Sequence, residues 1–252
     1  MFVITGGGSG IGRALAIELA SKEKPVLIIG RRENLLQEVA QQSPLINYLS
    51  ADISLSSGRQ KLVDYLKTHD TIDGLIHSAG TIEPVAKIGE IDESAWRKSL
   101  ETNIDSPLFL TQKLLPKLKN GRVLQIGSGA AYMPISGWTA YCCAKAALSM
   151  MVRCWKIENN LTIASVMPGI VATDMLAFGY SDPKKMSDEQ YDFYRDLREK
   201  NLLLDVDTVA SFLSWLLLQV PADEYTAKEW DIYDSSQHPK WLVPPNKVPQ
   251  WM

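Results

Sequence analysis

A chain of 252 residues is long enough to bury one sizeable hydrophobic core and does not require a second domain. Apolar residues make up 46% and charged residues 22% of the chain, and a net charge of -3 does not favour nucleic acid or an anionic membrane as a partner. No apolar run approaches the ~20 residues of a membrane-spanning helix, and the start lacks the basic segment of a signal peptide. The three cysteines fit neither a disulfide framework nor a zinc site, so we expect a cytoplasmic protein without a metal.

The first predicted elements are a strand over 2–5, a glycine-rich turn and a helix. Together they form a phosphate cradle, because small residues let the backbone approach a pyrophosphate at the positive end of the helix. A glycine-rich turn is more often only a turn, and the usual Gly-x-Gly-x-x-Gly spacing is not met, so this motif alone does not establish a nucleotide site. The residues that we expect at a dinucleotide are Thr5, Gly6, Gly8, Ser9, Gly10, Ile11 and Gly12.

The second strand, 25–30, ends in Arg31 and Arg32, about twenty residues beyond the glycines. An acidic residue there would hold the ribose hydroxyls of NAD, whereas arginine suits the 2′-phosphate of NADP. Arginines after a strand are usually only solvated charges, but after this glycine turn they favour NADP(H). The third strand ends at Asp52 and Ile53, where a carboxylate and an apolar side chain could bracket an adenine. Asp52 could equally cap the following turn.

The fourth strand, 74–80, ends in small residues that would let a nicotinamide ribose approach. A helical pattern over 92–119 follows, and Asn103 lies inside it. Asn103 is either a tolerated surface residue or the mark of a kink where backbone and water reach an active site, and we favour the kink. The small residues are Ser78, Ala79 and Gly80.

The next strand and helix carry the groups with the clearest chemistry. Ser128 follows an apolar run that predicts a buried strand, and a helix is predicted over 139–158. Tyr141 and Lys145 are four residues apart on that helix and therefore share one face. A free tyrosine titrates near ~10, and a close cation lowers this value by stabilising the phenolate. We therefore expect the ammonium of Lys145 to lower the pKa of Tyr141.

A strand over 161–167 runs into a proline and a glycine that break regular structure, and a threonine hydroxyl nearby could hold a carboxamide. Residues 174–204 are predicted to form one long irregular span with apolar side chains among charges. This span is either a mobile lid over a substrate or a small surface cluster, and we favour the lid. The residues that we expect beside the cofactor here are Pro168, Gly169, Val171 and Thr173.

Towards the C-terminus an apolar helix over 205–219 is expected in the core, and a last strand over 230–234 follows. Asp231 lies on the opposite face of that strand from Trp230. We therefore divide the chain into a domain at 1–234, which includes the substrate loop 174–204, and a proline-rich tail.

The tail, 235–252, is expected to contain no regular element. Its two tryptophans, Trp241 and Trp251, need a place to bury, either on the domain or on a second subunit.

In order and spacing, the motifs resemble the pattern of the short-chain dehydrogenase/reductase family over nearly the whole chain. Narrower features, G-W-T-A-Y-C-C-A-K-A-A and W-D-I-Y-D, look like the sepiapterin reductase and benzil reductase branch. The family's usual Asn-Ala-Gly is Ser-Ala-Gly here, and the glycine-rich end of many tetrameric members is absent. The matching positions are Thr5-Gly6-x-x-x-Gly10-x-Gly12, Asn103, Ser128, Tyr141-x-x-x-Lys145 and Pro168-Gly169.

The resemblance implies an α/β fold: a single domain of three layers with a Rossmann-like, doubly wound, seven-stranded parallel sheet. NADP(H) would lie across the carboxyl ends of the strands. It implies that Tyr141 donates a proton to a substrate carbonyl while the nicotinamide delivers hydride, and that Ser128 holds the carbonyl oxygen. Lys145 would bind the nicotinamide ribose and lower the pKa of Tyr141. Asn103 would position the water that relays protons to Lys145.

The implied activity is NADPH-dependent reduction of a ketone or vicinal dicarbonyl, with a sepiapterin-like or benzil-like small molecule as substrate. Sepiapterin reductases carry a substrate-anchoring aspartate at the position of Asp231, although an exposed strand aspartate is an equal interpretation. The residues that we expect at the substrate are Ser128, Trp138, Tyr141, Met175 and Asp231.

Two alternatives remain. A cofactor-sensing protein without turnover would have lost part of the Ser-Tyr-Lys set, and none is lost. An epimerase or dehydratase of the extended branch would need a longer segment after Gly169. By analogy with the family we expect a homodimer that forms through the helices around 94–119 and 139–158.

Overall fold

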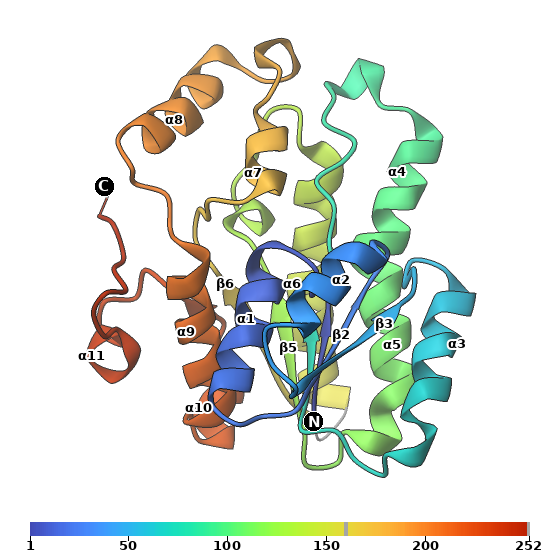
Figure 1. The fold of residues 1–252 in the computed structure, drawn as a ribbon. Coiled ribbons are helices and arrows are strands. Elements are labelled where there is room, and N and C mark those ends of the chain that lie inside the picture. The colour runs from blue at the N-terminus through green and yellow to red at the C-terminus, as the bar shows by residue number, and fades with distance from the viewer. Residues whose placement is uncertain (159–160, 251–252) are drawn as a thin grey trace.

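The computed structural model describes residues 1–158 and 161–250, which form a helix–sheet–helix sandwich (Figure 1). Within these residues seven parallel strands form one sheet in the order β3-β2-β1-β4-β5-β6-β7. The order reverses between β1 and β4, which is where a doubly wound sheet opens a crevice at its carboxyl edge. The predicted fold class is confirmed. The strands are β1 (Phe2–Thr5), β2 (Val26–Gly30), β3 (Ile46–Ser50), β4 (Gly74–His77), β5 (Arg122–Ile126), β6 (Thr162–Met167) and β7 (Trp230–Asp231).

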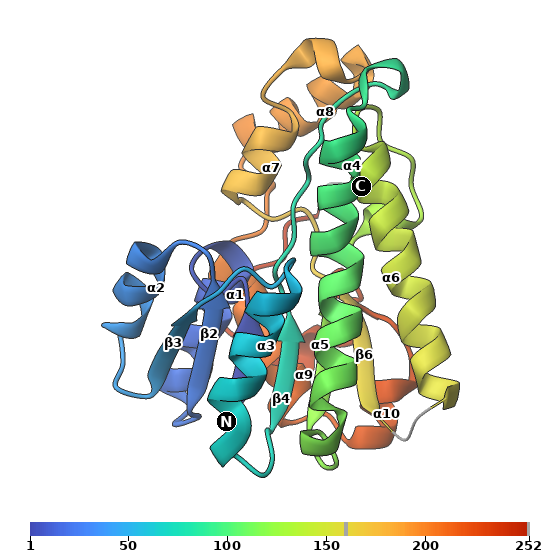
Figure 2. The ribbon, with the colours of Figure 1, turned by 90° about the vertical axis from the view of Figure 1, so that its right-hand side faces the viewer.

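Both faces of the sheet are buried, because successive residues of each strand point to opposite faces. Ile4 and Ile28 belong to one core cluster, and their neighbours Val3 and Leu27 belong to the other. Helices α1, α2 and α9 cover the first face, while α3, α5 and α6 cover the second (Figure 2). The bounds are α1 (Gly10–Ser21), α2 (Glu33–Ala40), α3 (Ser56–Tyr65), α4 (Glu93–Leu100), α5 (Ser106–Leu114), α6 (Thr139–Glu158), α7 (Asp174–Gly179), α8 (Asp188–Glu199), α9 (Val206–Leu218), α10 (Ala222–Ala227) and α11 (His238–Trp241).

The helical pattern over 92–119 is not one regular helix. Helices α4 and α5 are joined by a π-helical turn over Glu101–Asp105, and Asn103 lies inside this turn. Only 2% of Asn103 is exposed, so the surface interpretation is wrong, and the helix departs from regular α-helical geometry at this residue. That backbone and water reach an active site here stays a prediction. A π-helical turn inserts a wider loop of backbone into a helix and often occurs at functional sites.

The span over 174–204 is largely helical, so the prediction of an irregular segment is wrong. It contains α7, a short 3₁₀ turn at Pro183–Lys185, and α8. Most residues of α8 are charged, and only a narrow stripe that includes Tyr194 and Leu197 is buried, which is why the helical period is weak in the sequence. Tyr194 packs in a third apolar cluster with Trp138 and Ile82.

The C-terminal tail contains one helical turn, α11, where no regular element was expected. Trp241 buries its ring on the domain, 4.9 Å from the ring of Phe212 in α9. The Asn246 side chain then bonds to the hydroxyls of Thr208 and Ser211 on the same helix. The tail therefore packs on α9, while Trp251 lies outside the described residues. None of the described helices is long and apolar enough to cross a bilayer.

Candidate active site

A cavity of about 920 Å³ opens at the carboxyl ends of the strands, and side chains from the ends of β1 through β7 line it. The structure places every predicted site residue on its wall except Thr5, Gly12 and Asn103. Those three lie just behind the wall, and the contacts described below show what they hold in place. Most of the predicted residues therefore lie at one cavity, because parallel strands bring their carboxyl ends to one edge of the sheet.

The glycine-rich turn brings three segments of backbone into close contact. A Cβ on Gly6, whose φ is +71°, would lie 2.8 Å from the backbone nitrogen of Ala79, and one on Gly12 would lie 2.6 Å from the Gly6 carbonyl oxygen. Helix α1 begins at Gly10, and the preceding Ser9 makes no side-chain cap. The N–H groups of the first helical turn therefore keep their capacity to bind an anion at the positive end of the helix.

Thr5 shapes this end of the cavity from behind. Its hydroxyl accepts hydrogen bonds from the backbone N–H groups of Ser78 (3.2 Å) and Ala79 (3.1 Å) and donates to the carbonyl of Ile76. The end of β1 is thereby tied to the end of β4. Thr5 fixes the two small-residue turns relative to each other, although it does not line the cavity.

At the far end of the cavity the side chain of Arg32 donates to the hydroxyl of Ser9 (3.0 Å), and Arg31 lies beside it on the wall. Two guanidinium groups and a hydroxyl next to the helix N-terminus are groups that could hold a phosphate. Asp52 lines the cavity too, but its Oδ1 accepts from both the N–H and the hydroxyl of Ser54. The capping interpretation of Asp52 is thus correct for one carboxylate oxygen.

Asn103 uses its side chain to hold the loop after β4. Its Oδ1 accepts from the N–H of Thr81 (3.0 Å), and its Nδ2 donates to the Thr81 carbonyl (2.8 Å) and to the Ser99 hydroxyl. This side chain therefore has its hydrogen-bonding groups committed within the protein. If Asn103 contributes to a reaction, it does so with its backbone groups or by positioning the loop after β4, because its side chain is already hydrogen-bonded.

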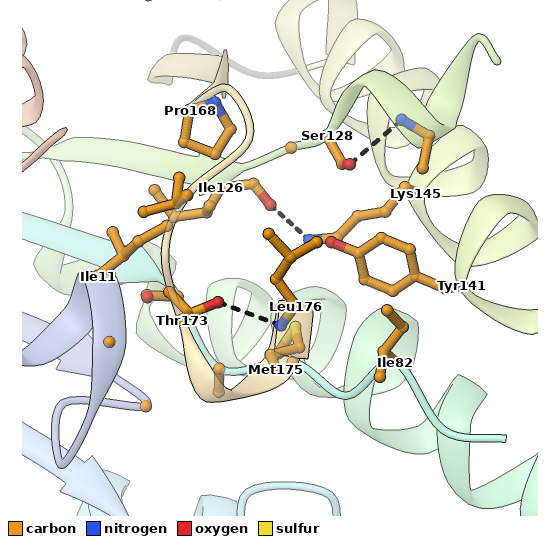
Figure 3. A pocket seen from close by; sticks show the side chains of 18 of the residues that line it. Ile11, Ile82, Ile126, Ser128, Tyr141, Lys145, Pro168, Thr173, Met175 and Leu176 are labelled. Atoms are coloured by element: carbon orange, nitrogen blue, oxygen red, sulfur yellow. Dashed lines mark hydrogen bonds between the residues drawn. The ribbon is translucent and has the colours of Figure 1, made fainter. Parts of the chain in front are cut away.

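Ser128, Tyr141 and Lys145 come together on one wall, as expected (Figure 3). The ammonium of Lys145 donates to the carbonyl oxygen of Ile126 (2.6 Å) and lies 5.5 Å from the centre of the Tyr141 ring. The Ser128 hydroxyl accepts from the N–H of Ala130 (3.2 Å), and its interaction with the phenol acts to lower the pKa of Tyr141. A hydroxyl, a phenol and an ammonium thus lie on one wall of the cavity.

The acidity of this group differs from the expectation that Lys145 lowers the pKa of Tyr141. Burial raises the pKa of Tyr141 to about 12, and the hydrogen bond from Ser128 only partly opposes this. Burial also lowers the pKa of Lys145 to about 8. The expectation is wrong because desolvation dominates and the ammonium donates to a carbonyl rather than to the phenol. At neutral pH Tyr141 keeps its proton and can act as a donor.

The other end of this wall is aromatic. Trp138 donates its indole N–H to the Gly179 carbonyl (2.9 Å), stands edge-on to Tyr141, and stacks on Tyr194 with the ring centres 5.2 Å apart. Met175 lines the cavity as expected. The hydroxyl of Thr173 accepts from the N–H of Leu176 and so caps α7, a use that the sequence analysis did not anticipate.

The sequence analysis did not single out Gln190, Tyr132 or Glu229. The Gln190 side chain accepts from the N–H of Ser136 (2.6 Å) and donates to the Pro134 carbonyl (3.1 Å), which fastens the first turn of α8 to the loop after Ser128. A second hydrogen bond holds the same loop, because the Tyr132 hydroxyl donates to the carboxylate of Glu229 (2.5 Å). These contacts join segments that are far apart in sequence, so no local sequence pattern predicts them.

Among residues 1–158 and 161–250 no cluster of three or more His, Cys, Asp or Glu side chains is arranged to hold a metal ion. The cysteines in this part of the chain, Cys142, Cys143 and Cys154, are free thiols.

Comparison with known proteins agrees with this geometry. A family model described as short chain dehydrogenase matches residues 1–183. An uncharacterized oxidoreductase of Saccharomyces cerevisiae is 35% identical over 227 residues, or 86% of this chain and 89% of that protein. A benzil reductase ((S)-benzoin forming) of Bacillus cereus is 29% identical over 232 residues, or 85% of this chain and 92% of that protein. The crystal structure of a Saccharomyces cerevisiae short chain dehydrogenase/reductase has a TM-score of 0.87 at 32% identity and covers 95% of this chain and 98% of its own.

The buried ammonium of Lys145 predicts a pH-dependent stability difference. Because the folded state lowers the pKa of Lys145 to about 8, burial of the protonated form destabilises the protein below that pH. We expect Lys145→Met to raise the free energy of unfolding at pH 7 by about 1–3 kcal/mol. Between pH 8 and the ordinary value of 10.5, the unfolded wild type binds more protons than the folded one, so its stability recovers and the gap closes.

Urea unfolding of both proteins from pH 7 to pH 10.5 measures this gap, and Lys113→Met, at an exposed lysine of α5, is the control for losing a charge. A variant that is less stable than the wild type at pH 7 would contradict the prediction.

Proposed function

The chain belongs to the short-chain dehydrogenase/reductase family of oxidoreductases, and we propose that within this family it is an NADPH-dependent carbonyl reductase. The family match extends over residues 1–183. The observation that carries the proposal is the convergence of Ser128, Tyr141 and Lys145 on one wall of a cavity whose far end presents Arg31 and Arg32. A proton donor for a carbonyl oxygen and a cationic site for a nucleotide phosphate thus belong to the same cavity.

The residues at the cofactor end fit a phosphorylated dinucleotide. Gly6 and Gly12 have no space for a Cβ against the neighbouring backbone, so they keep the glycine turn tightly packed beside the N-terminus of α1, which would hold the pyrophosphate. Ser9, Arg31 and Arg32 would hold the 2′-phosphate, and Asp52 and Ile53 would bracket the adenine.

The nicotinamide half has its own predicted contacts. The turn after β4 and the segment after β6 would flank the ring and its ribose, and when bound NADPH would supply the hydride. The residues proposed to line this half are Ser78, Ala79, Gly80, Pro168, Gly169, Val171 and Thr173.

The protein's own groups would then carry the proton. Tyr141 holds its proton at neutral pH because burial raises its pKa to about 12, and we propose that it donates this proton to the carbonyl oxygen as negative charge develops there. Ser128 would orient that oxygen by hydrogen bonding. Lys145, held against the Ile126 carbonyl, would hold the ribose and replenish the proton of Tyr141.

We propose a vicinal diketone of the benzil type as the first substrate class, since a Bacillus cereus relative at 29% identity is a benzil reductase. The aromatic wall formed by Trp138 and Tyr194 supports a substrate with an aryl group.

A sepiapterin-like pterin is the second substrate class that we propose. Asp231 supports it, because this carboxylate lines the cavity and uses only Oδ1 in accepting from the Tyr233 N–H.

The alternative from another class is an NADP-binding sensor without turnover. The intact Ser128, Tyr141 and Lys145 set argues against it, because a sensor has no use for a proton donor aimed into a cavity. The two proposals predict different effects of replacing Tyr141 on turnover and on NADPH binding.

Replacing Tyr141 by Phe tests the catalytic assignment. We expect Tyr141→Phe to lower kcat at least 100-fold, since the general acid is lost, while the dissociation constant for NADPH changes little. The measurement is NADPH absorbance against time with benzil and with sepiapterin, and NADPH binding is followed by fluorescence. A variant with wild-type turnover would refute the assignment, and a wild type that binds NADPH without turnover on any carbonyl compound would favour the sensor.

Cofactor choice has a separate test. Replacing both Arg31 and Arg32 by Ala should weaken NADPH binding by about 10- to 100-fold, because two charge-assisted phosphate contacts are lost, and should leave NADH binding almost unchanged. Titrating both cofactors into the wild type and the double variant measures this. Lys24→Ala, an exposed cation that does not line the cavity, is the control. Tighter binding of NADH than of NADPH by the wild type would overturn the proposal.

We further propose a cytoplasmic homodimer that forms through α5 and α6. Three large apolar side chains on these helices are exposed, Phe109 (37%), Met150 (51%) and Ile157 (87%). Light scattering should give twice the mass of the chain for the wild type and the mass of one chain for Met150→Glu combined with Ile157→Glu. A wild type that stays monomeric at every concentration contradicts the proposal.

A further inference from the structure

The cavity carries opposite charges at its two ends. Arg31 and Arg32 follow β2, whereas Asp231 lies on β7, five strands away in the sheet. Neighbouring strands are about 4.8 Å apart, so these ends are separated by about 24 Å. This exceeds the Debye length of about 8 Å at physiological ionic strength. The arginines therefore do little to neutralise charges at the other end.

The end near β7 is acidic. Asp231 lies on β7 and Glu189 lies in the first turn of α8, and both side chains line the cavity; we call these two residues the acidic rim. The helix backbone at Glu189 is held against the loop after Ser128, because the neighbouring Gln190 side chain bonds to the backbone of Pro134 and Ser136.

Cations are scarce at the same end. Among the described residues that line the cavity, the Lys and Arg side chains are Arg31, Arg32 and Lys145. Lys145 directs its ammonium to the carbonyl of Ile126, in the wall (Figure 3). Lys184 and Lys185 lie in the turn between α7 and α8, but they are exposed and do not line the cavity.

Between the acidic rim and Tyr141 the surface is apolar. Trp138 and Met175 line the inside. At the mouth Met133 and Tyr132 line the cavity while 66% and 58% of their surfaces remain exposed, respectively. Large apolar side chains left exposed at the mouth of a cavity are available to contact an apolar group of a ligand.

We propose that the substrate is an uncharged carbonyl compound with a bulky apolar or aromatic group, and that the acidic rim excludes carbonyl compounds that carry a carboxylate or phosphate beside the reacting carbon. This inference rests on the proposed reductase function. An anionic group would approach carboxylates of its own sign and would meet no arginine fork of the kind that recognises carboxylates. Repulsion of this kind discriminates against a competitor without any added contact to the preferred substrate.

The test compares phenylglyoxylate with phenylglyoxylamide, which share the aryl ketone and differ in charge. We expect kcat/KM of the wild type with NADPH to be at least about 100-fold higher for the amide. Because the intrinsic reactivity of the two ketones also differs, the decisive quantity is how the amide-to-acid ratio changes in a variant. Glu189→Gln combined with Asp231→Asn preserves shape and should reduce that ratio about tenfold.

The control is Glu199→Gln, at an exposed carboxylate of α8 that does not line the cavity, which should leave the ratio unchanged. Reduction of the acid as readily as the amide, or a ratio that the double variant leaves unchanged, overturns the charge exclusion while the reductase function stands. If the wild type reduces neither these compounds nor any diketone, the proposed function fails and the inference falls with it.

Discussion

One hydrogen bond, from the ammonium of Lys145 to the carbonyl of Ile126, fixes the geometry of this site. It joins α6 to the end of β5, two residues before Ser128. The helix that carries Tyr141 is thereby bonded to the strand that leads to Ser128. The bond keeps a cation in a wall from which water is excluded, and desolvation of that cation opposes folding. A buried group that costs stability and stands beside a phenol is what a functional site, rather than a structural one, tends to contain.

The sequence determined the parts of the fold that depend on local pattern. Apolar runs gave the strands, the Tyr-x-x-x-Lys spacing placed two groups on one helical face, and the asparagine inside a helical pattern marked a turn that the structure has at Asn103. The same reasoning could not show that the Thr5 hydroxyl ties β1 to β4 or that Gln190 fastens α8 to a loop, because each contact joins segments far apart in sequence. Helix α8 was missed because its buried stripe is narrow and its remaining residues are charged.

The direction of the Tyr141 pKa shift illustrates a second limit. Spacing shows that a cation is near, but the sign of the shift depends on how much water both groups lose and on where the ammonium donates. In the folded protein desolvation raises the pKa to about 12, and the interaction with Ser128 opposes this only in part. A sequence motif thus indicates which groups lie close together, while their pKa values depend on how the folded structure packs around them.

The two hydrogen bonds of Gln190 have a mechanical consequence. They join α8 to Pro134 and Ser136, on the loop that begins at Ser128, so α8 and this loop behave as one body unless both bonds break. Displacing the helix to admit a larger molecule would move the loop with it and shift the Ser128 hydroxyl. Entry of a ligand and the position of Ser128 are thereby linked, and this architecture favours compounds that fit the existing cavity over compounds that must displace α8.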